Sequence, residues 1–174
     1  MKTKLLLCLA LVLSGVVLTS SSCQSFRDRQ INKTSSEKNG VAVEVSIPGA
    51  VSAGQPVEML VNVTNAGPNS VFFKTWISAL GIHLVDSNKA TPEMTRRGKS
   101  GPDSVIDSGI VYGLPTMKEL KSREAYEWRV DLGTLFILRP GEYLVSLKLK
   151  LDATAPGGAV PLVISTDPLE FVIQ

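Results

Sequence analysis

Nucleophilic catalysis needs a histidine or a comparable base beside a serine or a cysteine, and this chain offers few residues for that task. It has one histidine, His83, and two cysteines, Cys8 and Cys23. In an extended segment the side chains of Ile82 and Leu84 point to the face opposite His83. We therefore expect His83 to be exposed or to make a structural hydrogen bond, and we expect a protein without catalytic residues.

Metal ligands are equally sparse. One histidine with Met59, Met94 and Met117 does not supply the ligand set that zinc or copper prefers. The acidic and amide side chains at 86–88 and 103–107 offer oxygen atoms for calcium, but their spacing matches no known calcium loop. Asx turns explain the same residues without a metal. The sequence thus predicts no metal and no cofactor.

An aromatic pair offers a candidate surface for sugar or peptide binding. Tyr126 and Trp128 share one face of a predicted strand, where they could form an exposed platform. Val130 and Leu132 continue the same face, which favours packing in the core instead. A secreted hydrolase would also need two carboxylates across a cleft, which a sequence alone does not place. A hydrolase or a carbohydrate-binding module is therefore a secondary alternative.

The N-terminus indicates where the protein works. Lys2 and Lys4 precede an apolar run at 5–18, and small polar residues at 19–22 stand before Cys23. A charged start, an apolar run and small residues are typical of an export signal. The run is shorter than the roughly 20 residues that a membrane-spanning helix needs. We therefore expect residues 1–22 to be a signal peptide that is removed on export.

The residues before Cys23 resemble the cleavage region of bacterial lipoproteins, although Ser20 stands where that family usually carries leucine. The resemblance implies cleavage before Cys23, acylation of its thiol and amino group, and a membrane partner through this lipid anchor at the cell envelope. Cys8 would leave with the signal, and a lone cysteine in an exported protein needs an explanation. Ordinary cleavage among the serines would instead leave a soluble secreted protein.

The charge balance of the mature chain bears on its partners, and the polarity of its first residues bears on their structure. Without Lys2 and Lys4 its 18 basic residues fall to 16, which equals the 16 acidic residues. Because nucleic-acid binders gather Lys and Arg on one face, we expect no nucleic-acid partner. The basic residues at 96–99 are expected to lie in a solvated loop. Residues 23–40 are polar and aperiodic, which predicts a flexible linker about 20–25 Å long.

Residues 41–174 are expected to form one domain, because apolar and polar side chains alternate there in short segments between turns. Seven or eight strands are predicted, at 41–47, 57–64, 71–77, 82–86, 110–114, 125–132, 143–151 and 169–173. Short helical turns are expected only near 117–120 and 132–136. Strands of this length, separated by Gly, Pro and Asn, predict an all-β antiparallel sandwich with Greek-key connections.

Two details of this domain resemble immunoglobulin-like sandwiches. Tyr143, after the residues LRPGE, resembles the tyrosine corner, which implies a bond from its hydroxyl to the backbone a few residues upstream. Trp76 lies on the third predicted strand, where such folds often bury a tryptophan. Val61 or Val63 and Val145 would stand in place of the usual cysteine pair.

The stretches GQPVEMLVNVTNAG and WRVDLGTLFILRPGEYLV are also similar to extracytoplasmic immunoglobulin-like domains of bacterial surface proteins, and to the proteinase-inhibitor domain first described in bacilli. Domains of these kinds bind a partner, support another structure or act as spacers. The resemblance implies a non-enzymatic envelope lipoprotein with an envelope protein as a candidate partner. The connection at 87–108 is the first candidate for the contact surface. Proteinase inhibition through an exposed loop is the alternative within binding, and Cys23 is the one functional residue that the sequence names.

Overall fold

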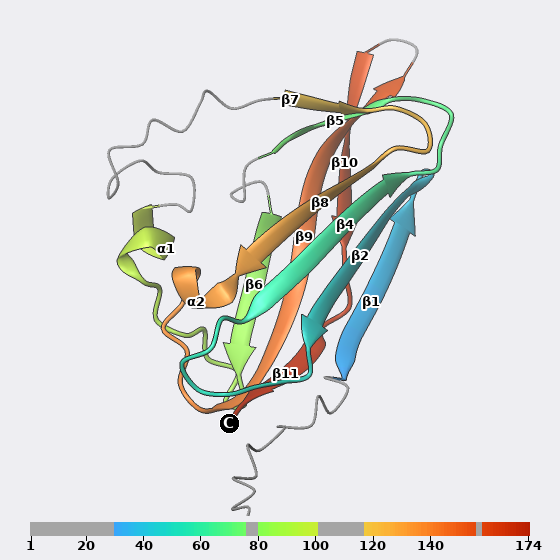
Figure 1. Cartoon of the computed structure of the whole chain (residues 1–174). Coiled ribbons are helices and arrows are strands. Elements are labelled where there is room, and N and C mark those ends of the chain that lie inside the picture. Colours follow the sequence, from blue (N-terminus) through green and yellow to red (C-terminus); the bar gives the residue numbers. More distant parts are fainter. Residues whose placement is uncertain (1–29, 76–79, 101–116, 156–157) are drawn as a thin grey trace, which may run out of the picture.

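The predicted all-β, immunoglobulin-like sandwich is confirmed (Figure 1). The computed structural model describes residues 30–75, 80–100, 117–155 and 158–174. These residues form β1 (Ile31–Lys38), β2 (Val41–Pro48), β3 (Ala50–Val51), β4 (Glu58–Asn65), β5 (Val71–Lys74), β6 (Leu80–Asp86), α1 (Arg96–Ser100), β7 (Met117–Leu120), β8 (Ala125–Asp131), α2 (Leu132–Leu135), β9 (Gly141–Ala155), β10 (Gly158–Ser165) and β11 (Leu169–Ile173).

The first sheet has the strand order β1-β2-β4-β8, and all of its pairs are antiparallel. The alternation of apolar and polar side chains sets the register of this sheet. Val43 opposes Val63 and Val45 opposes Val61, and all four side chains are buried. The residues between them turn to the solvent face, where Glu44, Asn62 and Glu127 lie opposite one another. One face is therefore apolar core and the other is polar surface.

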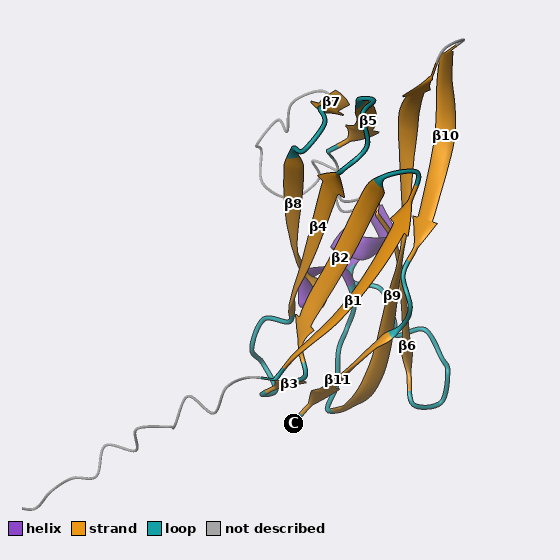
Figure 2. Ribbon diagram, turned by 90° about the vertical axis from the view of Figure 1, so that its right-hand side faces the viewer, coloured by secondary structure: helices purple, strands orange, loops and turns teal. Residues whose placement is uncertain are grey.

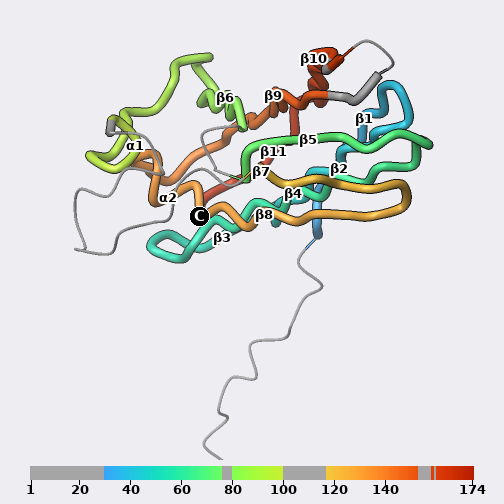
Figure 3. The backbone as a smooth tube through the Cα atoms, turned by 90° about the horizontal axis from the view of Figure 1, so that it is seen from above, coloured from blue at the N-terminus to red at the C-terminus, as the bar shows by residue number. Residues whose placement is uncertain are grey.

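The second sheet is organised around the long strand β9 (Figure 3). β11 and β10 pair with successive parts of β9 on one edge, and β6 and β5 pair with successive parts of its other edge. β7 adds to β5, and β3 pairs in parallel with β11. The end of β9 and the start of β10 form a hairpin that projects beyond the body of the sandwich (Figure 2).

Three aromatic side chains join the two sheets. Phe73 of β5 lies 5.1 Å from Trp128 and 5.2 Å from Tyr126, measured between ring centroids, and these two residues of β8 are 4.7 Å apart. The Trp128 indole N–H donates to the Thr75 carbonyl at 2.9 Å, so the polar atom of this buried ring is satisfied. Rings at these distances and tilts add attraction beyond the area that they bury.

The predicted linker at 23–40 is wrong over its second half, because residues 31–38 form β1. β1 pairs along its whole length with β2 through a tight turn at Asn39 and Gly40, both of which have positive φ. An Asn-Gly pair favours such a hairpin turn. The Asn32 amide also donates to the Glu170 carbonyl at 2.6 Å, so backbone pairing and a contact to the second sheet order a segment that has few apolar residues.

Other differences from the predicted strands have similar causes. Met117–Leu120, expected as a helical turn, is strand β7, because it pairs residue by residue with β5. β3 and β10 were not predicted, so the expected count of seven or eight strands was too low. The turn expected at 132–136 is helix α2, and the Asp131 carboxylate caps it by accepting from the Gly133 N–H. Trp76 and the strand at 110–114 lie outside the described residues.

The predicted bond of the Tyr143 hydroxyl is confirmed. The hydroxyl accepts from the Arg139 N–H at 2.9 Å and donates to the Arg139 carbonyl at 2.8 Å. The ring stacks on Phe171 with 5.3 Å between centroids, and Tyr143 is only 6% exposed. The corner therefore fixes the chain where it enters β9.

We expect Tyr143→Phe to lower the free energy of unfolding by about 1–2 kcal/mol, because it leaves both backbone groups of Arg139 without this partner. Urea denaturation followed by circular dichroism measures the change. Tyr126→Phe is the matched control, since the Tyr126 hydroxyl makes no hydrogen bond within the part of the chain that is described. Equal losses in the two variants would contradict the role of the corner.

Candidate functional site

The sequence named Cys23 as the lipidation site, and this residue lies outside the described residues. Its acylation therefore stays a prediction. No helix among the described elements is both long and apolar enough to cross a bilayer. The remaining candidates are the loop at 87–108, the aromatic pair, and the grooves between strands.

The described half of the 87–108 connection is folded against the sandwich. The Asp86 carboxylate accepts from the N–H groups of Asn88 and Ala90, both at 2.9 Å, which is the Asx turn expected in place of a calcium site. The calcium candidate at 103–107 lies outside the described residues. The chain then continues into α1, so this loop is a structured turn and helix over the part that is seen.

Helix α1 rests on α2. The Thr95 hydroxyl donates to the Thr134 carbonyl at 2.6 Å, and the Thr95 N–H donates to the Leu135 carbonyl at 2.9 Å. Gly98 lies so close to α2 that a Cβ there would overlap the Leu135 carbonyl oxygen. The basic residues at 96–99, expected in a loop, are therefore helical, although Arg97 stays exposed to solvent.

The aromatic pair forms no exposed platform. Trp128 is 4% exposed and packs with Tyr126 against Phe73, so the expectation of core packing is confirmed. His83 is exposed on β6, and exposure was one of the two outcomes expected from the sequence. Across the described residues, no three His, Cys, Asp or Glu side chains gather as a metal ion would need.

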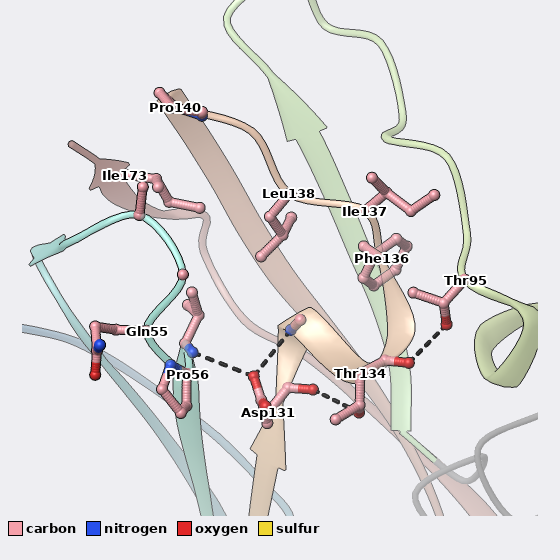
Figure 4. A pocket seen from close by; sticks show the side chains of 14 residues that line it. Gln55, Pro56, Thr95, Asp131, Thr134, Phe136, Ile137, Leu138, Pro140 and Ile173 are labelled. Atoms are coloured by element: carbon pink, nitrogen blue, oxygen red, sulfur yellow. Dashed lines mark hydrogen bonds between the residues drawn. The ribbon is translucent and has the colours of Figure 1, made fainter.

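A first groove, of about 470 Å³, lies at the end of the sandwich between residues 53–57, α2 and residues 136–140 (Figure 4). The polar side chains of Thr95, Asp131 and Thr134 make hydrogen bonds within the fold. The Asp131 carboxylate accepts from the N–H groups of Val57 and Gly133, at 3.1 and 2.9 Å. The Thr134 hydroxyl donates to the Asp131 carbonyl at 2.8 Å. We call it the end groove, and these hydrogen-bonded side chains have a structural role.

A second groove, of about 700 Å³, lies on the second sheet where β9 meets β10 on one edge and β5 and β6 on the other. We call it the lysine groove. Its charged residues are Lys74, Lys148, Lys150 and Asp152. Its other lining residues are Phe73, Gly81, Met117, Leu151, Pro161, Leu162 and Val163. It combines an apolar lining with a positive balance of charge.

The lysine groove lies beside the part of β9 that falls between its described pairings with β6 and with β5; residues 76–79, which join these two strands, are outside the described part. The pairing with β6 ends at Leu149, and the pairing with β5 resumes after Leu151. On the other edge of β9, Lys150 pairs with Val163 of β10. Gly81 at the start of β6 lies so near to Lys148 that a Cβ would come within 2.9 Å of the Lys148 carbonyl oxygen, so glycine allows the two strands to approach.

The groove gathers three unpaired cations from two strands. Its three ammonium groups have no carboxylate within 4.0 Å in the part of the chain that the structure describes, although Asp152 lines the same groove. Three other described cations do have carboxylate partners: Lys33 bonds Glu44 at 3.4 Å, Lys99 bonds Glu93 at 3.1 Å and Arg129 bonds Glu127 at 2.9 Å. The groove therefore presents three cations that are free to meet a ligand.

The sequence analysis missed the lysine groove. Lys148 and Lys150 do occupy the outward positions of the alternating strand predicted at 143–151. The register change between β5 and β6 and the presence of β10 were not visible in the pattern, and these features bring Lys74 and Pro161 to the same place. Outward lysines on one strand were the only available signal.

No protein-family model matches the chain, and the comparison with curated proteins found no match.

Proposed function

We propose that this protein is a non-enzymatic lipoprotein of the bacterial cell envelope, anchored through Cys23, whose immunoglobulin-like domain binds a partner at the membrane surface. The observation that carries the proposal is the start of the folded domain at Ile31, close behind a lipoprotein-like cysteine. A sandwich placed so near its anchor is a rigid body suited to binding or spacing at a membrane.

Binding is favoured over spacing alone because the lysine groove offers unpaired charge beside apolar surface. The carbohydrate-module alternative relied on Tyr126 and Trp128, which pack together with Phe73. Proteinase inhibition through the 87–108 loop is not favoured by the described half of that loop, since it is held in an Asx turn and in α1. A loop that engages a protease presents extended backbone away from the body.

Mass spectrometry of the mature N-terminal peptide from the native host tests the anchor. We expect acyl mass on Cys23 and recovery of the protein with membranes, because two or more acyl chains hold a protein firmly on a bilayer. Cys23→Ala is expected to abolish both. Cys8→Ala is the matched control, since this residue would leave with the signal and its loss should change neither result. An unmodified terminus in the wild type would refute the lipoprotein and indicate a soluble exported protein.

A further inference from the structure

We propose that the lysine groove binds an amphiphile that has an apolar body and a phosphate head group. This inference does not depend on acylation of Cys23. It rests on the unpaired lysines, on the apolar lining beside them, and on the volume of the groove.

The first step of the argument is charge. Lys148 and Lys150 are exposed and alternate with buried Leu147, Leu149 and Leu151, so both point to the outer face of β9. Residues two apart on a strand lie about 6.5–7 Å from each other, close enough for both to contact one phosphate group. Like charges that lie close together repel one another while the groove is empty, and a bound anion relieves that repulsion.

The second step is the apolar lining. Phe73, Leu151 and Leu162 border the groove but are only 1–3% exposed, so its accessible apolar surface comes from Met117, which is 49% exposed, from exposed Pro161 and from half-buried Val163. A simple anion would leave this apolar surface in water. A ligand that covers it gains the hydrophobic contribution as well as the charge interaction, which a free phosphate ion does not.

The third step is space. Because Gly81 has no side chain, β6 approaches β9 there without covering Lys148. A groove of about 700 Å³ falls within the range of sites that hold small ligands. The groove is thus large enough for a short acyl chain next to its head group.

Calorimetric titration of the mature chain (residues 23–174) carrying Cys23→Ala tests this proposal. Dodecyl phosphate, below its micellar concentration, is expected to bind with a stoichiometry of one. Inorganic phosphate should bind at least about 100-fold more weakly, because it gains nothing from the apolar lining. Dodecyl maltoside, which has the same chain and no charge, should bind at least about tenfold more weakly, because it gains nothing from the lysines.

Matched variants locate the site. Lys148→Gln and Lys150→Gln should each weaken dodecyl phosphate binding by about tenfold, since each removes a charge-assisted contact. Lys33→Gln, on the first sheet, should change it by less than about twofold. Thermal melting checks that each variant is folded.

Three results would overturn the inference: no binding of dodecyl phosphate, equal binding of the maltoside, or an equal effect of Lys33→Gln and Lys148→Gln. Tighter binding of an acidic peptide than of dodecyl phosphate would also overturn it, and would make a protein segment the occupant. Because the chain in this titration carries no acyl group, failure here is distinct from failure of the lipoprotein proposal.

Discussion

Phe73→Ala is expected to lower the free energy of unfolding by about 3–5 kcal/mol, as is usual for a large aromatic residue removed from a core. Phe73 is 1% exposed and contacts both Tyr126 and Trp128. Its removal opens a cavity between the two sheets and breaks two ring contacts at once. Chemical denaturation followed by far-ultraviolet circular dichroism measures the loss without depending on tryptophan fluorescence.

The neighbouring Phe72 supplies the matched control. It has the same side chain on the same strand, but it points to the outer face and is only half-buried. We expect Phe72→Ala to cost less than about 1.5 kcal/mol, because the site is partly solvated and leaves no closed cavity. A loss as large as that of Phe73→Ala would show that the aromatic junction between the sheets is not what stabilises this region.

Asn65→Ala is expected to cost about 3 kcal/mol or more. Asn65 is 1% exposed, and its amide donates to the carbonyls of Asn69 and Leu120 at 2.8 and 2.9 Å. Its side-chain oxygen accepts from the Gly67 N–H at 3.1 Å. The substitution leaves the Asn69 and Leu120 carbonyls without these partners, whereas the Gly67 N–H keeps its bond to the Gly40 carbonyl at 2.9 Å. Each unsatisfied group costs roughly 1–3 kcal/mol when it is buried. Urea denaturation measures the change.

Two further variants separate hydrogen bonding from packing at this position. Asn65→Asp keeps the shape and the accepting oxygen but removes both donated bonds, so we expect a loss close to that of Asn65→Ala. Asn62→Ala, on the solvent face of the same strand, should cost less than about 1 kcal/mol. Near-native stability of Asn65→Asp would contradict the assignment of the donated bonds.

The strands of the core could be predicted from the sequence because their side chains alternate. Val43, Val63 and Val145 each stand at inward positions that the pattern identifies, and the described strands follow it. β1 escaped prediction because its ordering comes from backbone pairing and not from apolar burial. The Asn39-Gly40 pair was a readable signal that the linker prediction passed over, and both residues have the positive φ values of the hairpin turn that such a pair favours.

The candidate sites were less predictable than the strands. Tyr143 was found because a tyrosine corner depends on a short local sequence. The lysine groove depends on Lys74, Lys148 and Pro161, which three different strands bring together through their pairing register. Such long-range placement leaves no local pattern, so only the folded arrangement reveals it.

Strand β1 also has a consequence for orientation. Because β1 begins at Ile31, about seven residues separate Cys23 from the sandwich. Even a fully extended segment of that length reaches only about 25 Å. β1 starts at the end of the domain where the chain also finishes, and the β9–β10 hairpin projects from the opposite end (Figure 1). A lipid on Cys23 would therefore give the domain a polarity, with the end groove turned toward the bilayer and the hairpin turned away from it.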